Sequence, residues 1–465
     1  MTPDQWSKAH REELIRDIGK LVACPSVSKQ EAESLYGSGV DSAMKTAADI
    51  AEAYGFSVIP NNHVLRVVCK QPDMPGGKEV GIWAHMDVVE PGAGWMRDPW
   101  HMEVRDGFLL GRGVKDNKGP AMAVLHALRY IQEEHIKFPY GLSLYLGASE
   151  ENGMGDIEAY RREGGRFPDF SIVADGRWPV AFGEKGQILA ELENSVSDDS
   201  GILGIEAGSA DNVVCGEACA WLNTGLEQVP DGISQDRQGE RICLKARGIS
   251  RHAAFPEGGI NAFEVLADAL SQIPGQNRRD RSQFLLSGRI AGEYDGKTLG
   301  IACADEDSGP LTCVVTRAHM DAAHVLRICV NIRYPVTYEE DEIIGRLQEG
   351  SRTQGLSCRI LHSSRPVKVD KNHPLINALM DGYRKVTGRD EAPFVLSGGT
   401  YAGRLPQAVS FGMGGWNEAG LSELTGTGRG GAHGPDEAVL IENLLAGMEI
   451  YIEALARLGK TELEP

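Results

Sequence analysis

The chain has 465 residues, a formal net charge of −19 and 42% hydrophobic residues, which is an ordinary globular balance. At this length a single hydrophobic core stops growing, so two domains are expected. The acidic balance argues against a nucleic-acid or anionic-membrane partner, because both need a positive surface. No stretch approaches the roughly 18 apolar residues of a membrane span, and the N-terminus lacks the apolar core of a signal peptide. The nine cysteines lack paired spacing, which favours reduced thiols and a cytoplasmic protein.

Strands and helices alternate over the first part of the chain. Apolar positions recur with a helical period in residues 3–23, 42–54 and 119–135. Short apolar runs predict strands at residues 80–89, 140–148 and 170–174. This alternation predicts an α/β layer structure with a mostly parallel central sheet.

The middle of the chain has a different pattern. Residues 241–249 and 325–334 are expected to form strands, and residues 259–273 and 340–354 are expected to form helices. This mixture predicts a separate α+β domain, although no internal repeat proves that it has two similar halves.

The first pattern returns near residue 371. Residues 372–386 and 437–458 are expected helices, and residues 394–396 are an expected strand. We therefore expect one α/β domain, formed by residues 1–184 and 371–465. It would be interrupted by an inserted α+β domain of residues 185–370.

Glycine is dense near the end of the chain, with 12 glycines in the 37 residues from Gly398 to Gly434. A flexible surface loop is one interpretation of this composition. The other is a ligand site, because glycine permits positive φ angles and close approach of the backbone to a ligand.

Polar side chains follow three of the expected strands. His85 and Asp87 end the first strand, Glu150 and Glu151 follow the second, and Asp175 follows the third. Each of them has an ordinary explanation, such as a local hydrogen bond or a solvated turn. Residues i and i+2 of a strand share a face, so the Asp87 carboxylate could also hold the His85 imidazole in one tautomer.

Asp116 and His433 complete this group of polar residues. Asp116 directly precedes an expected helix, where an acidic residue is common, and His433 lies in the glycine-dense segment. In open α/β sheets, ligands bind at the carboxyl ends of the strands. Histidines and carboxylates without cysteine form a mixed ligand set that suits Zn²⁺, Mn²⁺ or Co²⁺. Two such ions that share a bridging carboxylate could activate a water molecule for hydrolysis.

Six motifs place these residues in a family. In chain order they are AHMDVVEPGAGW, DGFLLGRGVKDNKGP, GASEENG, VADGRWPVAFGEKG, GGTYAGRLP and GGAHGPDE. Their order and spacing resemble the dinuclear-zinc metallopeptidases that include carboxypeptidase G, aminoacylase and the PepV-type dipeptidases, and the PepV-type branch most of all. The resemblance covers nearly the whole chain. It implies a zinc-peptidase-like catalytic domain interrupted by an inserted, ferredoxin-like and doubled lid domain.

The resemblance also implies two metal ions, zinc by preference and manganese or cobalt otherwise. One ion would be held by His85, Asp116 and Asp175. The other would be held by Asp116, Glu151 and His433, with Asp116 as the bridge.

Further roles follow from the same resemblance. Glu150 would be the general base that takes a proton from water, and Asp87 would orient His85. The peptide bond between Asp116 and Asn117 is expected to be cis. Asn152 stands where the family more often has threonine, and it is not expected to bind a metal ion.

Matching positions in the inserted domain imply contacts with the substrate. His252 would stabilise the oxyanion when the lid closes. Asn212 and Arg333 would contact the substrate, and Arg333 would bind a carboxylate of the substrate. Backbone donors to the substrate terminus are expected from Gly398, Gly399 and Thr400.

The implied function is metal-dependent hydrolysis of the peptide bond of a dipeptide. N-acyl amino acid deacylation is the alternative within the same chemistry. A catalytically silent binding protein is the alternative from another class, and the complete set of ligands with Glu150 disfavours it. The doubled lid would cover the surface through which smaller relatives dimerise, so a monomer is preferred over a homodimer. The side-chain preference of the enzyme stays open.

Overall fold

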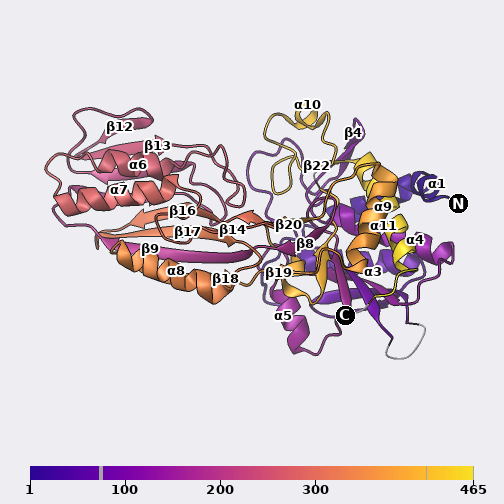
Figure 1. The fold of residues 1–465 in the computed structure, drawn as a ribbon. Coiled ribbons are helices and arrows are strands. Elements are labelled where there is room, and N and C mark those ends of the chain that lie inside the picture. The colour runs from indigo at the N-terminus through magenta and orange to yellow at the C-terminus, as the bar shows by residue number, and fades with distance from the viewer. Residues whose placement is uncertain (73–76, 415, 464–465) are drawn as a thin grey trace. The chain divides into compact units, whose positions relative to one another are not determined.

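The computed structural model describes residues 1–72, 77–414 and 416–463, and it divides into two compact units (Figure 1). The first unit contains residues 1–183, 368–394 and 399–465. The second unit contains residues 184–367 and 395–398. One unit is therefore inserted into the sequence of the other, and the short segment 395–398 groups with the inserted unit.

A mixed sheet forms the centre of the first unit. Its strand order is β1-β2-β6-β3-β7-β21-β8-β19, and β20 pairs with β8. The four strands β6, β3, β7 and β21 are parallel, whereas β1, β2 and β8 are antiparallel to their neighbours. The expected α/β class with a parallel centre is confirmed. The strands are β1 (Ser57–Ile59), β2 (Val64–Lys70), β3 (Glu79–His85), β6 (Gly141–Gly147), β7 (Phe170–Val173), β8 (Ala181–Glu184), β19 (Val367–Lys368), β20 (Phe394–Leu396) and β21 (Ala408–Ser410).

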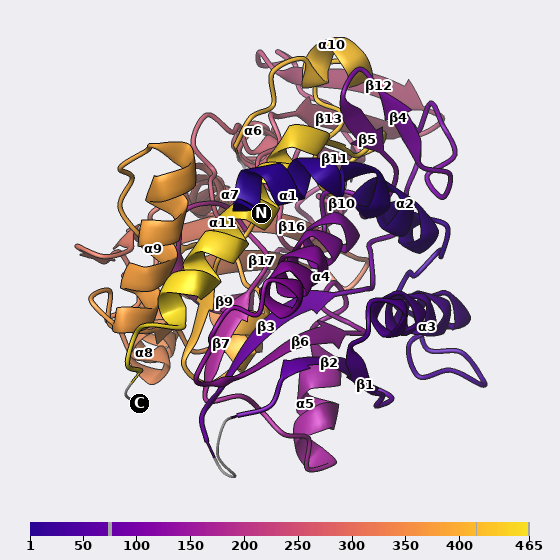
Figure 2. The ribbon, with the colours of Figure 1, turned by 90° about the vertical axis from the view of Figure 1, so that its right-hand side faces the viewer.

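Helices cover one face of this sheet. The closing helix α11 (Ile441–Leu458) packs against both α4 (Lys118–Glu133) and α9 (Pro374–Thr387), as Figure 2 shows. Every residue of β3 is buried, which is the pattern of a strand covered on both faces. Helices α1 (Pro3–Ala9), α2 (Arg11–Val22) and α3 (Ser38–Ala53) also belong to this unit.

The other face of the sheet carries a smaller aromatic cluster. Helix α5 (Gly155–Arg162) and the 3-10 turn η1 (Tyr401–Arg404) pack there. The rings of Trp83 and Tyr145 stack with their centroids 4.4 Å apart. Tyr401 is fully buried against Trp83, so η1 is anchored directly beside the sheet.

Two expected helices differ from the structure. The helix expected over residues 3–23 is two helices that meet at His10, whose ring stacks on Trp6. The helix expected over 437–458 starts only at Ile441. The residues before it form β22 (Ala438–Leu440), which pairs with β5 (Phe108–Leu110), itself paired with β4 (Glu103–Arg105).

The glycine-dense segment is more ordered than a surface loop. It holds η1, β21 and the short helix α10 (Leu421–Thr425). Leu421 packs with Phe108 and Leu110 in a small hydrophobic cluster. The segment is therefore not a loop throughout, because these three elements interrupt it.

The second unit is built on an eight-stranded, wholly antiparallel sheet. Its order is β12-β13-β11-β10-β16-β17-β9-β18. The strands are β9 (Gly186–Ser195), β10 (Ile202–Ala207), β11 (Glu217–Leu222), β12 (Ile233–Gln238), β13 (Arg241–Arg247), β16 (Thr312–Met320), β17 (Val325–Tyr334) and β18 (Ser357–Ser364). A separate hairpin pairs β14 (Ala304–Asp305) with β15 (Gly309–Pro310).

Two groups of helices cover this sheet. Helix α6 (Ala262–Leu270) and helix α7 (Arg278–Gly292) lie over one half, and α8 (Glu340–Thr353) lies over the other (Figure 1). Buried residues of all three helices belong to one hydrophobic cluster. The halves join through β10 and β16, which agrees with a doubled lid.

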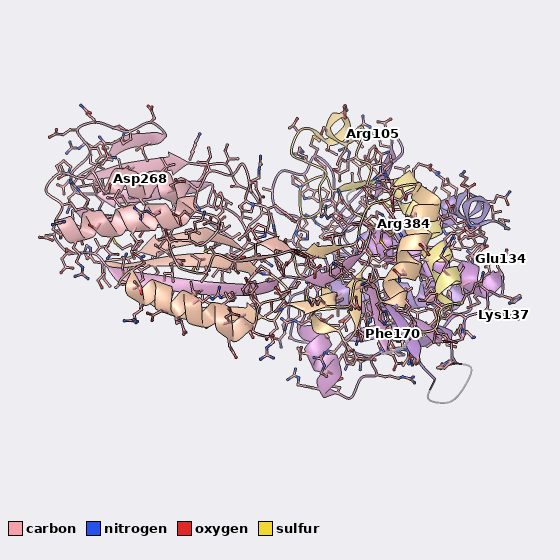
Figure 3. The ribbon with its side chains drawn as sticks, viewed as in Figure 1. Arg105, Glu134, Lys137, Phe170, Asp268 and Arg384 are labelled. Atoms are coloured by element: carbon pink, nitrogen blue, oxygen red, sulfur yellow. The ribbon has the colours of Figure 1, made fainter. Side chains whose placement is uncertain are left out.

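Charged side chains lie at the surface of both units. Glu134, Lys137 and Arg384 project outward from the first unit, whereas Phe170 in β7 is buried (Figure 3). Among the described residues, the helices are all too short or too polar to cross a membrane.

Candidate metal centre

The five expected metal ligands lie in the first unit, at the ends of its elements. His85 is the last residue of β3, Glu151 follows β6 and Asp175 follows β7. Asp116 precedes α4, and His433 precedes β22. Because β3, β6 and β7 are parallel, their carboxyl ends share one edge of the sheet, where α/β proteins bind ligands.

The side chains of these residues form two overlapping groups of potential ligands. His85, Asp116 and Asp175 form one group, and Asp116, Glu151 and His433 form the other. Within each group the ligand atoms lie within 4.8 Å of one another. The sequence therefore identified residues that the structure brings together from five separate segments.

Asp116 stands between the two histidines. Its Oδ1 lies 3.1 Å from Nε2 of His85, and its Oδ2 lies 3.1 Å from Nε2 of His433. The two carboxylate oxygens thus face different ligand groups, as a bridging carboxylate requires. The N-cap of α4 is Asn117, so Asp116 is not a helix cap. The Asp116–Asn117 peptide is cis, as expected.

Asn117 connects the segment of Asp116 to two strands. Its side-chain amide donates to the carbonyl of Ala174 at 2.8 Å, beside Asp175. Its Oδ1 accepts from the backbone N–H of His85 at 3.4 Å. The side chain therefore fixes Asp116 between the ends of β3 and β7.

The environment of His85 differs from the expected one. Its Nδ1 lies 2.9 Å from the main-chain oxygen of Asp87, and 3.4 Å from the carboxylate. The carboxylate of Asp87 instead accepts the backbone N–H groups of Glu150 and Glu151, at 2.9 and 3.0 Å. Asp87 thus orients the imidazole mainly through its backbone, and its side chain positions the acidic pair.

The metal-free cluster favours protonated histidines. Contacts with Asp116 and Glu151 raise the pKa of His433 to about 11. Burial opposes the charged form of His85, but hydrogen bonds to Asp116 and Asp87 raise its pKa well above 6.5. Burial also acts against the charged form of Asp116, but its hydrogen bonds to both histidines lower its pKa.

Two other carboxyl groups have raised pKa values. Burial, with the nearby charge of Asp116, raises the pKa of Asp175 to about 7. Burial raises the pKa of Glu150 well above 4.5, against the effect of His85. Glu150 is 9% exposed and lies among the ligands, where a general base could reach a water molecule.

The donor set fits metal ions. Three carboxylates and two imidazoles converge without a thiol, which suits Zn²⁺, Mn²⁺ or Co²⁺. Among the described residues, no lysine or arginine forms an ion pair with Asp116, Glu151 or Asp175. Bound cations would supply the positive charge that this group of carboxylates otherwise takes from protonated histidines.

Sequence reasoning missed the buried residues that support the ligands. Glu437 accepts backbone N–H groups of the Asp116 loop, and Asp156 accepts those of Ala148 and Ser149, just before Glu150. Tyr401 donates its hydroxyl to Asp156. Glu437 and Tyr401 lie within quoted motifs, but only the folded chain shows which backbone they hold.

The expected substrate-contacting residues of the inserted domain lie close together in the second unit. Ala253, next to His252, donates its N–H to the carbonyl of Asn212 at 2.8 Å. Asn331 connects the carbonyl of Asp211 with Nε of Arg333. Asn212 and His252 are exposed, whereas Arg333 is buried, and burial lowers its pKa to about 10.

The three residues expected to offer backbone donors lie where the sequence passes from the second unit back to the first. Gly398 belongs to the second unit, and Gly399 and Thr400 belong to the first. The hydroxyl of Thr400 accepts from the N–H of Ala402 and caps η1. That hydroxyl is thus engaged within the fold, and the backbone role of all three residues stays a prediction.

Comparisons with known proteins point to a family of peptidases. A model of peptidase family M20/M25/M40 matches residues 81–457. YtjP of Bacillus subtilis (strain 168) is 28% identical over 471 residues, which cover 97% of this chain and 98% of YtjP. Beta-Ala-Xaa dipeptidase of Lactobacillus delbrueckii subsp. lactis is 27% identical, with 98% of each chain covered. The structure of aminoacylhistidine dipeptidase from Vibrio alginolyticus superimposes with a TM-score of 0.58, at 13% identity and 97% coverage of each chain.

Proposed function

Because this chain belongs to peptidase family M20/M25/M40, we propose that it hydrolyses the peptide bond of dipeptides. The observation that carries the proposal is the pair of ligand groups that share Asp116, with Glu150 beside them. A full-length relative named Beta-Ala-Xaa dipeptidase supports dipeptides as the substrate class.

Two divalent ions, zinc by preference and manganese or cobalt otherwise, would be held by the five ligands. His85 and Asp175 would bind one ion, Glu151 and His433 would bind the other, and Asp116 would bind both. When bound, the ions would polarise the substrate carbonyl and make a water molecule more acidic.

Glu150 would act as the general base. Its backbone N–H donates to the carboxylate of Asp87, which fixes the residue beside the ligands. Its own carboxyl group would accept a proton from the attacking water. The same group would then pass that proton to the amine that leaves. General bases of this kind contribute roughly 10²–10⁴ in rate.

Residues of the second unit would bind the substrate. His252 would donate to the oxyanion as the peptide carbonyl becomes tetrahedral. Arg333 would pair with the substrate carboxylate, with Asn331 holding its guanidinium in place at 2.9 Å. Asn212 would add a polar contact beside His252.

A substrate panel tests this function. Dipeptides, including β-alanyl dipeptides, tripeptides and N-acetyl amino acids would be offered to metal-stripped protein and to protein restored with Zn²⁺ or Mn²⁺. We expect cleavage of dipeptides only after metal is restored. Cleavage of the acetylated compounds alone would assign the protein to the deacylases instead.

A matched variant separates metal dependence from substrate choice. Asp116→Asn removes the charge of the proposed bridge with little change of shape. It should stay inactive toward every compound after the same metal treatment. Activity of this variant equal to that of the parent would contradict the assigned ligands.

A further inference from the structure

A buried glutamate next to the ligands has no role in the proposed mechanism. Glu437 is 0% exposed, and its carboxylate accepts four hydrogen bonds. Oε1 accepts the backbone N–H groups of Lys115 and Asp116, at 2.9 and 3.1 Å. Oε2 accepts the backbone N–H of Gly113 at 3.1 Å and a guanidinium nitrogen of Arg112 at 2.6 Å. One carboxylate thus fixes the loop that ends in Asp116.

Arg112, which pairs with Glu437, also contacts the loop that carries His433. Arg112 is 1% exposed, and its Nη2 lies 3.4 Å from the main-chain oxygen of His433. The backbone N–H of Gly111 also donates to the main-chain oxygen of Glu437 at 2.9 Å. The pair therefore joins two loops that are more than 300 residues apart in sequence and that each carry one ligand.

We propose that Glu437, paired with Arg112, is a positioning residue that sets Asp116 and His433 at the spacing one metal ion requires. This inference rests on the proposed function, where Asp116 and His433 are ligands of the same ion. Glu151, the third ligand of that ion, is held separately by Asp87. Loss of Glu437 should therefore weaken the ion bound through His433 more than the ion bound through His85 and Asp175.

The chemistry of the contacts favours glutamate over glutamine at this position. Every partner of Glu437 is a donor, and a carboxylate offers acceptors at both oxygens. In Glu437→Gln, the amide NH₂ would face either two backbone N–H groups or a backbone N–H and the guanidinium. The loop before Asp116 would then lose at least two of its hydrogen bonds to this side chain.

The chain offers a matched control for the loss of a buried ion pair. Glu79 is also 0% exposed, and its Oε1 lies 2.5 Å from Arg66 while it accepts from Ser143 and Tyr145. It starts strand β3, about 20 Å of extended chain from His85 at the other end. Glu79→Gln should therefore destabilise the fold without changing the ligands.

The Zn²⁺ affinities of Glu437→Gln and Glu79→Gln distinguish a positioning role from a general loss of stability. The metal-free parent, Glu437→Gln and Glu79→Gln would each be titrated with Zn²⁺ against a chromophoric chelator, and their thermal unfolding would be recorded without metal. We expect two bound ions in the parent, and two in Glu79→Gln with parental affinities and a lower Tm. Glu437→Gln should bind one of the two ions roughly 10–100-fold more weakly.

The same titration separates the failure of this inference from the failure of the proposed function. Parental affinities for both ions in Glu437→Gln would overturn the positioning role. Fewer than two ions in the parent would overturn the proposed ligand set itself. If Glu437→Gln does not fold, Arg112→Lys replaces it, because lysine keeps the charge but cannot reach both Glu437 and His433. That variant should show the same selective weakening, and equal weakening of both ions would contradict the inference.

Discussion

The candidate metal centre of the first unit and the proposed substrate-contacting group of the second unit are built differently. Five segments supply the ligands, and buried side chains such as Asp87, Asp156 and Glu437 hold those segments by their backbone N–H groups. Asn212 and His252, in contrast, are exposed. A backbone hydrogen bond from Ala253 to the carbonyl of Asn212 joins their two segments. The first region places its charged groups on a buried, hydrogen-bonded frame. In the second region Arg333 is buried, unlike Asn212 and His252.

This difference separates two kinds of effect. Changes in the first region should alter metal content, or the chemistry that depends on it. Changes in the second region should alter rate or substrate affinity while the metal content stays the same.

Among variants that keep all five proposed ligands, the largest loss of rate is expected for Glu150→Gln. The amide keeps the size of the side chain but cannot accept the proton of the attacking water, so kcat should fall by about 10³-fold. Metal content should equal that of the parent, because Glu150 is not a proposed ligand. Steady-state kinetics with metal analysis of the same sample checks both statements.

An exposed glutamate of the same unit provides the control for this variant. Glu158 on α5 is exposed and pairs with its neighbour Arg161, so Glu158→Gln should keep parental kinetics. Full turnover of Glu150→Gln would remove Glu150 from the mechanism.

His252→Ala should lower kcat by about 10²-fold, because one donor to the oxyanion is lost. Metal content should not change, since His252 lies in the second unit. His319 in β16 is a suitable control: its side chain is 47% exposed and pairs with Glu206. If His252→Ala and His319→Ala show the same kinetics, the role of His252 is wrong.

Metal affinity should fall steeply with falling pH. In the metal-free centre both imidazoles hold protons at neutral pH, because the pKa of His433 is about 11 and that of His85 is well above 6.5. The ion at Glu151 and His433 would displace the proton of His433, so its affinity should drop by about 10-fold per pH unit below neutrality. The ion at His85 and Asp175 would displace the proton of His85 and, below the Asp175 pKa of about 7, that of Asp175 too, so its affinity should drop by up to about 100-fold per pH unit. Calorimetric titration in buffers of different ionisation enthalpy would count the released protons. A pH-independent affinity would contradict the assignment of these histidines as ligands.

Arg333→Lys should have the smallest of these effects. Lysine keeps the charge but loses the two-pronged contact with a carboxylate, so KM should rise by about 10-fold with little change in kcat. Arg327 lies on the same strand and pairs with Glu193, so Arg327→Lys is the matched control. An unchanged KM for Arg333→Lys would show that this arginine does not bind the substrate.

Much of the first unit could be predicted from the sequence, because local patterns determine it. The apolar run of β3 and the periodicity of α4 placed His85 and Asp116 at element ends. The break at His10 was not visible, since apolar positions continue through it with a helical period. Helix α7 was missed because its arginine-rich sequence has few apolar residues to show a period.

The supporting residues could not be predicted for a different reason. Glu437 lies 321 residues from Asp116 in sequence, and a glutamate before a helix has an ordinary structural explanation. Asp156 likewise reads as an acid in the first turn of α5. The roles of such residues depend on long-range packing, which a single sequence does not reveal.

Anomalous diffraction from crystals grown with zinc tests the central claim most directly. We expect two peaks in the first unit, one beside His85 and Asp175 and one beside Glu151 and His433. Asp116 should approach both peaks, at about 2.0–2.2 Å, the usual zinc–oxygen distance. Peaks away from these residues, or a single ion that Asp116 does not contact, would contradict the account.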